Sequence, residues 1–357
     1  MIAITSIGVM SPLGIDPAEI TAALREGESA AFPSDTHMHS DGTPWLAAEV
    51  PPFKITEYIT PKPFLDRNSA LLLAACGSAL QAAACDPKSL PEGRCGIAVG
   101  TLWGGLDTLD LFFSDYLAKG PRLVKPLLFP HTYANTAISM AAMEWALTGE
   151  HHNFVSDRTA SGQAICEAAA IIAESRADLM LAAGTEAISG PLLRYLDYLT
   201  VASPTPIIPA EAGAALVLEH PGKAAARGVT PLAHISGYAT ATTAATALTA
   251  ALERAATTAD AVGWGVISTA DTPHGEAEAN ALTTITGNPH LPLVAPLALC
   301  GEMYGATTAF LTACAALMLN QRFIAPVVPA NTCSTIPAGA CAIVTAADHN
   351  ATALILN

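Results

Sequence analysis

The stretch most suggestive of chemistry is residues 153–184, NFVSDRTASGQAICEAAAIIAESRADLMLAAG. Its pattern indicates a short buried strand, a sharp turn, a long helix and a second buried strand. Enzymes often place a nucleophile at such a turn, because the helix dipole stabilises negative charge at the helix N-terminus. Thr159 and Ser161 offer a hydroxyl there, but no His–Asp pair is evident to activate a hydroxyl, and Cys166 lies two turns into the helix and cannot sit at its mouth.

Helices and buried strands alternate along the rest of the chain, which predicts mixed or parallel sheets that are covered on both faces. A helix is expected after Asp16 as N-cap, with Pro17 at the first position and Glu19 at the third. Residues 28–62 are rich in Pro, Ser, Thr and His and are interpreted as a surface excursion. Further helices are predicted at 64–84, 106–120, 131–149, 244–259 and 275–287, and a glycine turn that leads into a buried helix at 300–321. Strands are predicted at 2–10, 95–100, 212–220, 263–269, 339–346 and 351–357.

Composition excludes several classes of function. Apolar residues make up 51% of the 357 residues and charged residues only 13%, so a large core or subunit interface is expected. No run of about 20 apolar residues is present, which argues against a membrane span. The net charge of −15 with only 16 Lys and Arg argues against nucleic acid and anionic membranes as partners. The start of the chain lacks a basic signal region, so a cytoplasmic protein is expected.

The eight cysteines are expected to be buried free thiols, because none forms a C-x-x-C pair and most lie within apolar patterns. No disulfide or zinc site is therefore predicted.

Six segments in order resemble β-ketoacyl-ACP synthases over nearly the whole chain. They are AITSIGVMSPLGIDPAEITAALREGESA (3–30), GPRLVKPLLFPHTYANTAISMAA (120–142), ADLMLAAGTEA (177–187), AEAGAALVLEH (210–220), CGEMYGATTAFLTACAALML (300–319) and RFIAPVVPANT (322–332). The resemblance implies a thiolase-like α/β fold of five αβαβα layers, with two pseudo-symmetric βαβαβαββ halves at 1–220 and 221–357. It also implies dimerisation through a strand beside the active site, and no cofactor or metal.

The catalytic positions of that family are substituted in this sequence. The Cys position falls on Arg158 without a gap, or on Thr159 with one gap. One His position falls on Ser268, the other on Glu302, and the Lys position on Leu297. His274, which follows Pro273, is interpreted as a loop residue, and ADHNA (347–351) replaces the family's glycine-rich FGFGG loop.

The concerted loss resembles the chain length factor, an inactive partner of the ketosynthase in type II polyketide and aryl polyene systems. That resemblance implies a heterodimer with an active ketosynthase, a tunnel at the interface, and carrier-protein docking mainly on the partner, since carrier proteins are acidic like this chain. Candidate tunnel residues are Leu109, Phe112, Phe113, Tyr116, Phe129 and Tyr133. For any single one of them, a place in the core is the simpler expectation.

Two alternatives are open. One is an active thiolase-fold acyltransferase that uses Thr159, Ser161 or Cys166, and the other is a purely structural homodimer.

A buried arginine needs an anionic partner. Glu302 stands at the family position that faces Arg158, so an ion pair between these two residues is expected to fill the former active site. The alternative is that Arg158 turns to solvent or pairs with Asp157.

Overall fold

The computed structural model describes residues 1–200, 207–326 and 335–357. The strands are β1 (Ile2–Met10), β2 (Phe32–Met38), β3 (Pro44–Ala47), β4 (Cys95–Thr101), β5 (His151–Val155), β6 (Leu179–Glu186), β7 (Ala212–Glu219), β8 (Ala233–Ala241), β9 (Val262–Val266), β10 (Leu293–Val294), β11 (Ala340–Ala346) and β12 (Ala351–Leu356). The helices are α1 (Pro17–Glu26), α2 (Arg67–Ala82), α3 (Leu106–Lys119), α4 (Thr136–Trp145), α5 (Ala160–Ala173), α6 (Gly190–Thr200), α7 (Pro221–Ala226), α8 (Ala244–Ala255), α9 (Pro273–Thr286), α10 (Leu297–Cys300) and α11 (Thr307–Gln321). Short 3₁₀ turns include η3 (Pro126–His131) and η5 (Tyr304–Ala306).

The large sheet is built from two arrays with the same strand order. The first array runs β5-β4-β6-β7-β1 and the second runs β10-β9-β11-β12-β8. In each array the next-to-last strand, β7 or β12, is antiparallel to both of its neighbours. A short antiparallel ladder, Ile2–Ile4 against Ala233–Ile235, joins the arrays. The predicted mixed sheets and internal symmetry are therefore present.

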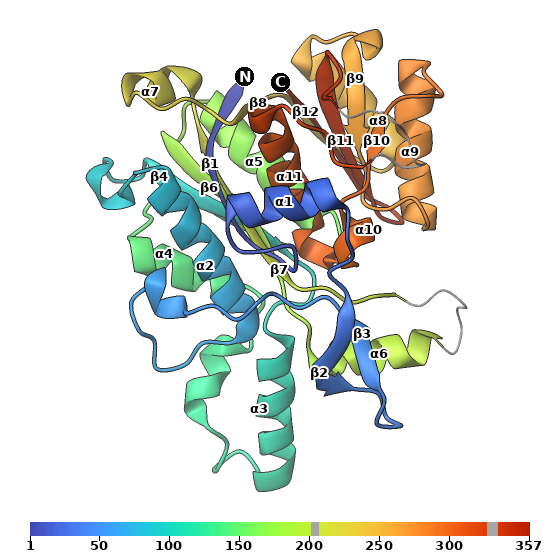
Figure 1. The fold of residues 1–357 in the computed structure, drawn as a ribbon. Coiled ribbons are helices and arrows are strands. Elements are labelled where there is room, and N and C mark those ends of the chain that lie inside the picture. Colours follow the sequence, from blue (N-terminus) through green and yellow to red (C-terminus); the bar gives the residue numbers. More distant parts are fainter. Residues whose placement is uncertain (201–206, 327–334) are drawn as a thin grey trace.

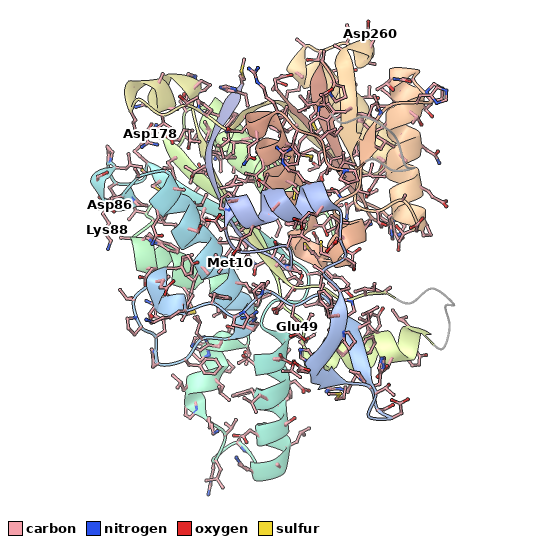
Figure 2. All side chains as sticks on the ribbon, in the orientation of Figure 1. Met10, Glu49, Asp86, Lys88, Asp178 and Asp260 are labelled. Carbon is pink, nitrogen blue, oxygen red and sulfur yellow. The ribbon has the colours of Figure 1, made fainter. Side chains whose placement is uncertain are left out.

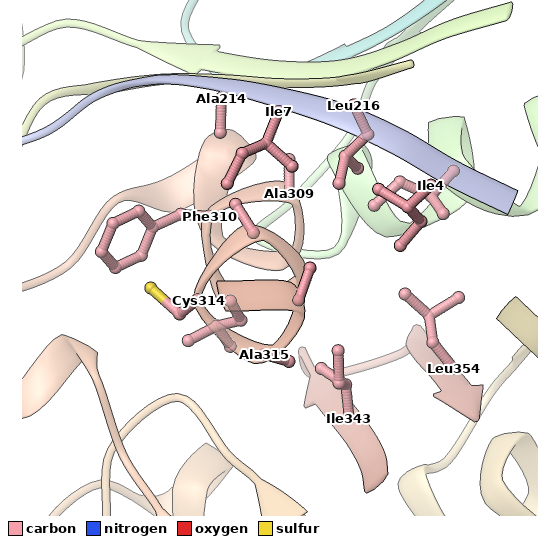
Figure 3. Packing of buried hydrophobic residues seen from close by; sticks show 14 of the residues in the cluster. Ile4, Ile7, Ala214, Leu216, Ala309, Phe310, Cys314, Ala315, Ile343 and Leu354 are labelled. Atoms are coloured by element: carbon pink, nitrogen blue, oxygen red, sulfur yellow. The ribbon is translucent and has the colours of Figure 1, made fainter. Parts of the chain in front are cut away.

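Helices α5 and α11 lie between the two arrays and form the middle layer of the fold (Figure 1). Helices α2 and α4 cover the outer face of the first array, and α8 and α9 cover the outer face of the second. Figure 3 shows α11 from close by, with Phe310 and Cys314 in the layer between Ile7 of β1 and Ile343 of β11. The five-layer thiolase-like fold expected from the resemblance is confirmed.

The first helix begins where its capping residues predict. The Asp16 carboxylate accepts a hydrogen bond from the Ala18 N–H at 2.7 Å, and the Glu19 carboxylate accepts one from the Ile15 N–H at 3.0 Å. The helix ends at Gly27, whose φ of 69° is the left-handed conformation that glycine adopts without strain. Local capping chemistry thus fixes both ends of α1.

Several boundaries differ from the predictions, and two of the helix starts have a clear local cause. Helix α2 begins at Arg67 rather than 64, because the Asp66 side chain caps it by accepting from Ser69 N–H. Helix α4 begins at Thr136 rather than 131, since Pro126 and Pro130 hold the preceding residues in the η3 turn. The excursion at 28–62 contains the β2–β3 hairpin, and its Trp45 is only 4% exposed. The segment is therefore partly core.

Many charged side chains lie at the periphery of the molecule, although Arg158, Glu186 and Glu278 are buried. In Figure 2, Asp86, Lys88 and Asp260 lie at the outside, whereas Met10 lies in the interior. No helix of the described residues has the length and apolar character needed to cross a membrane. The seven cysteines in the described ranges are free, and all except the half-buried Cys85 are buried; Cys333 and part of the segment 322–332 lie outside those ranges.

Candidate functional site

The N-terminus of α5 is seated by small residues that allow close backbone approach. A Cβ on Gly100 of β4 would lie 2.1 Å from the Ser161 nitrogen, and one on Gly184 of β6 would lie 2.6 Å from the Ser161 Cβ. A Cβ on Gly162 would lie 2.2 Å from the Thr352 hydroxyl oxygen. These contacts hold the turn at 156–159 at the mouth of the helix, as the nucleophile-site pattern predicts.

Arg158 occupies that turn and is paired with Glu302. Its Nη2 donates a hydrogen bond to Glu302 Oε2 at 2.7 Å, and the Arg158 residue is only 7% exposed. The neighbouring Asp157 carboxylate is engaged elsewhere, since it accepts from Thr159 N–H at 2.8 Å and from Asn350 Nδ2 at 2.7 Å. The predicted ion pair with Glu302 is therefore present, and the alternative pairing with Asp157 is not.

Backbone contacts on both sides fix Glu302. Its N–H donates to the Ile208 carbonyl and its own carbonyl accepts from Ala210 N–H, both at 2.9 Å. The preceding Gly301 has φ 80°, and a Cβ there would lie 2.5 Å from the Ile208 oxygen. Glu302 Oε1 also accepts from Tyr304 N–H at 2.9 Å. These contacts fix the position of the Glu302 carboxylate independently of Arg158.

A second carboxylate, Glu278 of α9, lies on the other side of the guanidinium. Its Oε1 is 3.8 Å from Arg158 Nη1, and its side chain is fully buried. Glu278 Oε2 accepts from both the N–H and the hydroxyl of Ser268 at 2.7 Å. The Ser268 carbonyl in turn accepts from Leu297 N–H at 3.2 Å. Arg158, Ser268, Leu297 and Glu302 therefore come together at one site, which we call the socket.

The sequence analysis missed Glu278. The available signal was its spacing, because Glu278 shares one buried helix face with Ala281 and Leu282, at i+3 and i+4. Burial raises the pKa of Glu278, while the nearby Arg158 charge and the hydrogen bonds from Ser268 lower it. One guanidinium thus faces two carboxyl groups, the fully buried Glu278 and the partly buried Glu302.

Glu186, at the end of β6, ties the socket to the turn after β4. Its fully buried carboxylate accepts from the N–H groups of Leu102 at 2.7 Å, Trp103 at 3.1 Å and Gly305 at 3.2 Å. Burial raises the pKa of Glu186 to about 7, against the opposing effect of these hydrogen bonds. The segments 101–105 and 301–305 are therefore held by one side chain.

A family model described as "Beta-ketoacyl synthase, N-terminal domain" matches residues 1–196. The chain belongs to the β-ketoacyl synthase family. A relative named 3-oxoacyl-[acyl-carrier-protein] synthase 2 from Coxiella burnetii is 30% identical over 54% of this chain and 47% of that protein, about half of its length. A relative of the same name from Staphylococcus aureus is 26% identical over 92% of this chain and 90% of that protein.

Solved structures show the same ketosynthase fold over the full chain. The ishigamide ketosynthase/chain length factor has a TM-score of 0.88 at 22% identity, covering 100% of this chain and 98% of that chain. A β-ketoacyl synthase from Burkholderia phymatum has a TM-score of 0.85 at 25% identity, with the same coverage. A ketosynthase in complex with its chain length factor from Xenorhabdus doucetiae has a TM-score of 0.83 at 17% identity, covering 100% and 97%.

The other possible nucleophiles of this ketosynthase-family chain are engaged or buried. The Thr159 hydroxyl donates to Asp157 at 2.6 Å, and Ser161 Oγ accepts from Ala309 N–H at 3.1 Å. Both residues are fully buried. Cys166 lies within α5, and burial raises its thiol pKa to about 12, so the thiol is protonated at neutral pH.

His274 lies in the first turn of α9 rather than in a loop, which corrects that expectation. Its Nε2 is 3.2 Å from Asp348 Oδ1 in the turn between β11 and β12. The pair is exposed at the surface. Together with the bond from Asn350 to Asp157, it holds the turn at 347–350 next to the socket.

The six candidate tunnel residues lie on one arm, which is formed by α3, η3 and the turn at 132–135 and projects from the body of the molecule (Figure 1). The arm carries an aromatic chain in which the Phe129 ring lies 5.7 Å from Phe112 and 5.4 Å from Tyr133. Phe113 is 53% exposed, Phe129 49% and Tyr133 50%; Tyr116 is also exposed, and Leu109 and Phe112 are partly buried. The simpler expectation that these residues are core is wrong for the four exposed ones.

One cluster of the described residues has the spacing of metal ligands. Ligand atoms of Glu150, His152 and Glu167 all lie within 4.8 Å of one another. The Arg176 guanidinium already pairs with Glu150, and its Nη2 is 3.5 Å from Glu167. The cluster is therefore explained as an exposed ion-pair network.

We predict that Arg158→Ala destabilises the chain by about 3–5 kcal/mol, because it leaves the fully buried Glu278 and the partly buried Glu302 without their cation. The double variant R158M/E302Q should recover only the part of this loss that comes from Glu302, since the amide oxygen of the new glutamine side chain can still accept from Tyr304 N–H, whereas Glu278 still lacks a cation. Urea unfolding followed by circular dichroism measures both. The loss in R158A should shrink at low pH, where the carboxylates are protonated. Equal losses in the single and double variants would contradict a buried pair.

Proposed function

We propose that this chain is a non-catalytic ketosynthase-like subunit, acting as a chain length factor. It pairs with an active β-ketoacyl-ACP synthase and shapes the tunnel that sets the length of a polyketide or polyene chain. The chain is short for this family, and this compactness favours an aryl polyene type of pathway. The two-half division after residue 220, which falls between β7 and β8, is likewise a proposal.

The observation that carries the proposal is the Arg158–Glu302 pair at the mouth of α5. Claisen condensation in this family needs a thiolate at the helix N-terminus and imidazoles around it. Here a cation fills the first position and is neutralised by a carboxylate at the second, 2.7 Å away. Ser268, at the other imidazole position, is fully buried and bound to Glu278. None of the described residues at these three positions, Arg158, Ser268 and Glu302, is the thiol or imidazole that the family's reaction uses.

Two features support a partner subunit. Strand β5 ends the first array, so its outer edge has no neighbour in the described sheet and offers free backbone N–H and C=O groups. The arm of α3 and η3 exposes large apolar side chains that a monomer would ordinarily cover. A ketosynthase seated on both would cover the open strand and the arm together. Its own acyl chain could then reach the aromatic residues of the arm.

The charge of the chain assigns carrier-protein docking to the partner. Acyl carrier proteins are acidic, and like charges disfavour encounter. A subunit with a net charge of −15 is therefore better suited to line the tunnel than to bind the acidic carrier protein.

We expect the chain to form a one-to-one complex with the ketosynthase encoded beside it. Co-production with a tag on this chain alone, followed by affinity purification and mass photometry, measures the stoichiometry. The chain produced alone should aggregate through the exposed arm. A well-behaved homodimer that is indifferent to the ketosynthase would favour a purely structural role.

We expect no CO2 release when the isolated chain is given malonyl-loaded carrier protein. A malonyl carboxylate would meet Glu302 and Glu278, and Arg158 stands at the position where the family's reacting thiol would accept the acyl group. Release of labelled CO2 from radioactive malonyl groups measures the activity, with the purified ketosynthase as the positive control. Release above the level of a buffer blank would refute the non-catalytic assignment.

Phe113→Ala and Tyr133→Ala in the complex should each lengthen the product by one or more extension units, because each removes an aromatic ring from the arm. Mass spectrometry of the released chains measures the distribution. Tyr198→Ala on α6 is the matched control, since Tyr198 is also an exposed aromatic but lies off the arm. Unchanged lengths in both arm variants would count against this placement of the tunnel.

A further inference from the structure

A hollow of about 450 Å³ opens beside the edge strand β5. Phe154 of β5 and Cys166 of α5 line one side of it, and the end of β8 with Arg254 of α8 lines the other. Asn350, which bonds to Asp157, also lines it. The hollow therefore extends from Arg254 of α8 to Asn350, whose side chain bonds to the residue before Arg158.

The Arg254 guanidinium is held at this hollow without an anion. It lies over the Tyr238 ring, 4.3 Å from the ring centroid, which fixes the plane of the cation. Among the described residues it has no recorded ion pair or hydrogen bond, although the whole chain has 31 acidic residues against 16 basic ones. Its N–H groups are thus oriented and available to a carboxylate.

Glu167, the acidic residue that lines the hollow, is already paired with other side chains. Glu167 lies 3.5 Å from Arg176 Nη2 and 3.9 Å from His152 Nε2. It belongs to the exposed ion-pair network described above and has no recorded pair with Arg254. An anion for Arg254 would therefore come from outside the described chain.

The open edge of β5, beside the hollow, indicates that this anion would come from a protein whose strand pairs with β5. A second hollow of about 320 Å³ is lined by His151 and Asn153, the alternate residues of β5. The Asn153 Oδ1 atom is buried there with no hydrogen-bond donor among the described residues. Side chains of a strand paired with β5 would alternate between the two faces and so reach both hollows.

We propose that the ketosynthase partner places an Asp or Glu side chain in the larger hollow, paired with Arg254, while one of its strands lies along β5. The proposal rests on the proposed function and names the contact that selects the partner. A second copy of this chain is disfavoured as occupant, because each copy would bring a net charge of −15. Arg254 would thus favour the heterodimer over a homodimer.

The test uses the full chain co-produced with the neighbouring ketosynthase. In the variant R254K, a zero-length carbodiimide cross-linker should join the new amine to a carboxylate of the ketosynthase, and peptide mass spectrometry identifies the residue. R254E should weaken capture of the ketosynthase by at least tenfold. Reversing the identified carboxylate to Lys in the partner should restore capture by R254E.

The matched control is Arg25, which also lies in the last turn of its helix and stacks on an aromatic ring, 4.0 Å from the centroid of Phe323. R25K should give no cross-link to the ketosynthase and R25E should bind normally. Normal capture by R254E, or cross-links from residue 254 only to a second, isotope-labelled copy of this chain, would overturn the proposal. Failure of the wild-type chain to capture the ketosynthase would instead overturn the proposed function itself, and the proposal with it.

Discussion

A guanidinium buried at the N-terminus of α5 is the constraint around which the socket is organised. The helix dipole disfavours a cation at this position, and burial removes its hydration. Only adjacent carboxylates make the arrangement stable, and the structure supplies them from two distant segments, Glu302 after α10 and Glu278 in α9. Each carboxylate is fixed by backbone N–H groups, so the anionic surroundings are preorganised for the cation.

The thiolase-like frame explains why these segments meet. The two arrays repeat one strand order, and the middle-layer helices α5 and α11 lie between them. The segment just before α5 carries Arg158, and the segment just before α11 carries Glu302, so the two residues occupy related places in the two halves. A frame that brings two helix N-termini together suits a catalytic centre, and here it holds an ion pair.

The buried elements and the pairing of Arg158 with Glu302 were predictable from sequence. Long apolar helices and strands are specified by period and capping, as at Asp16 and Gly27, and the family motifs supply the order in which they pack. The role of Glu278 was only partly predictable, because its spacing to Ala281 and Leu282 indicates a buried helix face but not the distant partner Arg158. The exposure of the arm was missed for a similar reason, since an amphipathic pattern reports an apolar face but not whether the same chain covers it.

The socket and the proposed interface are connected through the turn at 156–159. Asp157 precedes Arg158, and its carboxylate binds Asn350, which lines the larger hollow. Strand β5 leads directly into the same turn. The filled socket therefore stabilises the turn that sets the position of the open edge and of the hollow beside it. Under the proposed function, loss of catalysis and gain of a partner would be linked by geometry. The ion pair at the former catalytic positions would also keep rigid the surface on which the ketosynthase is proposed to bind.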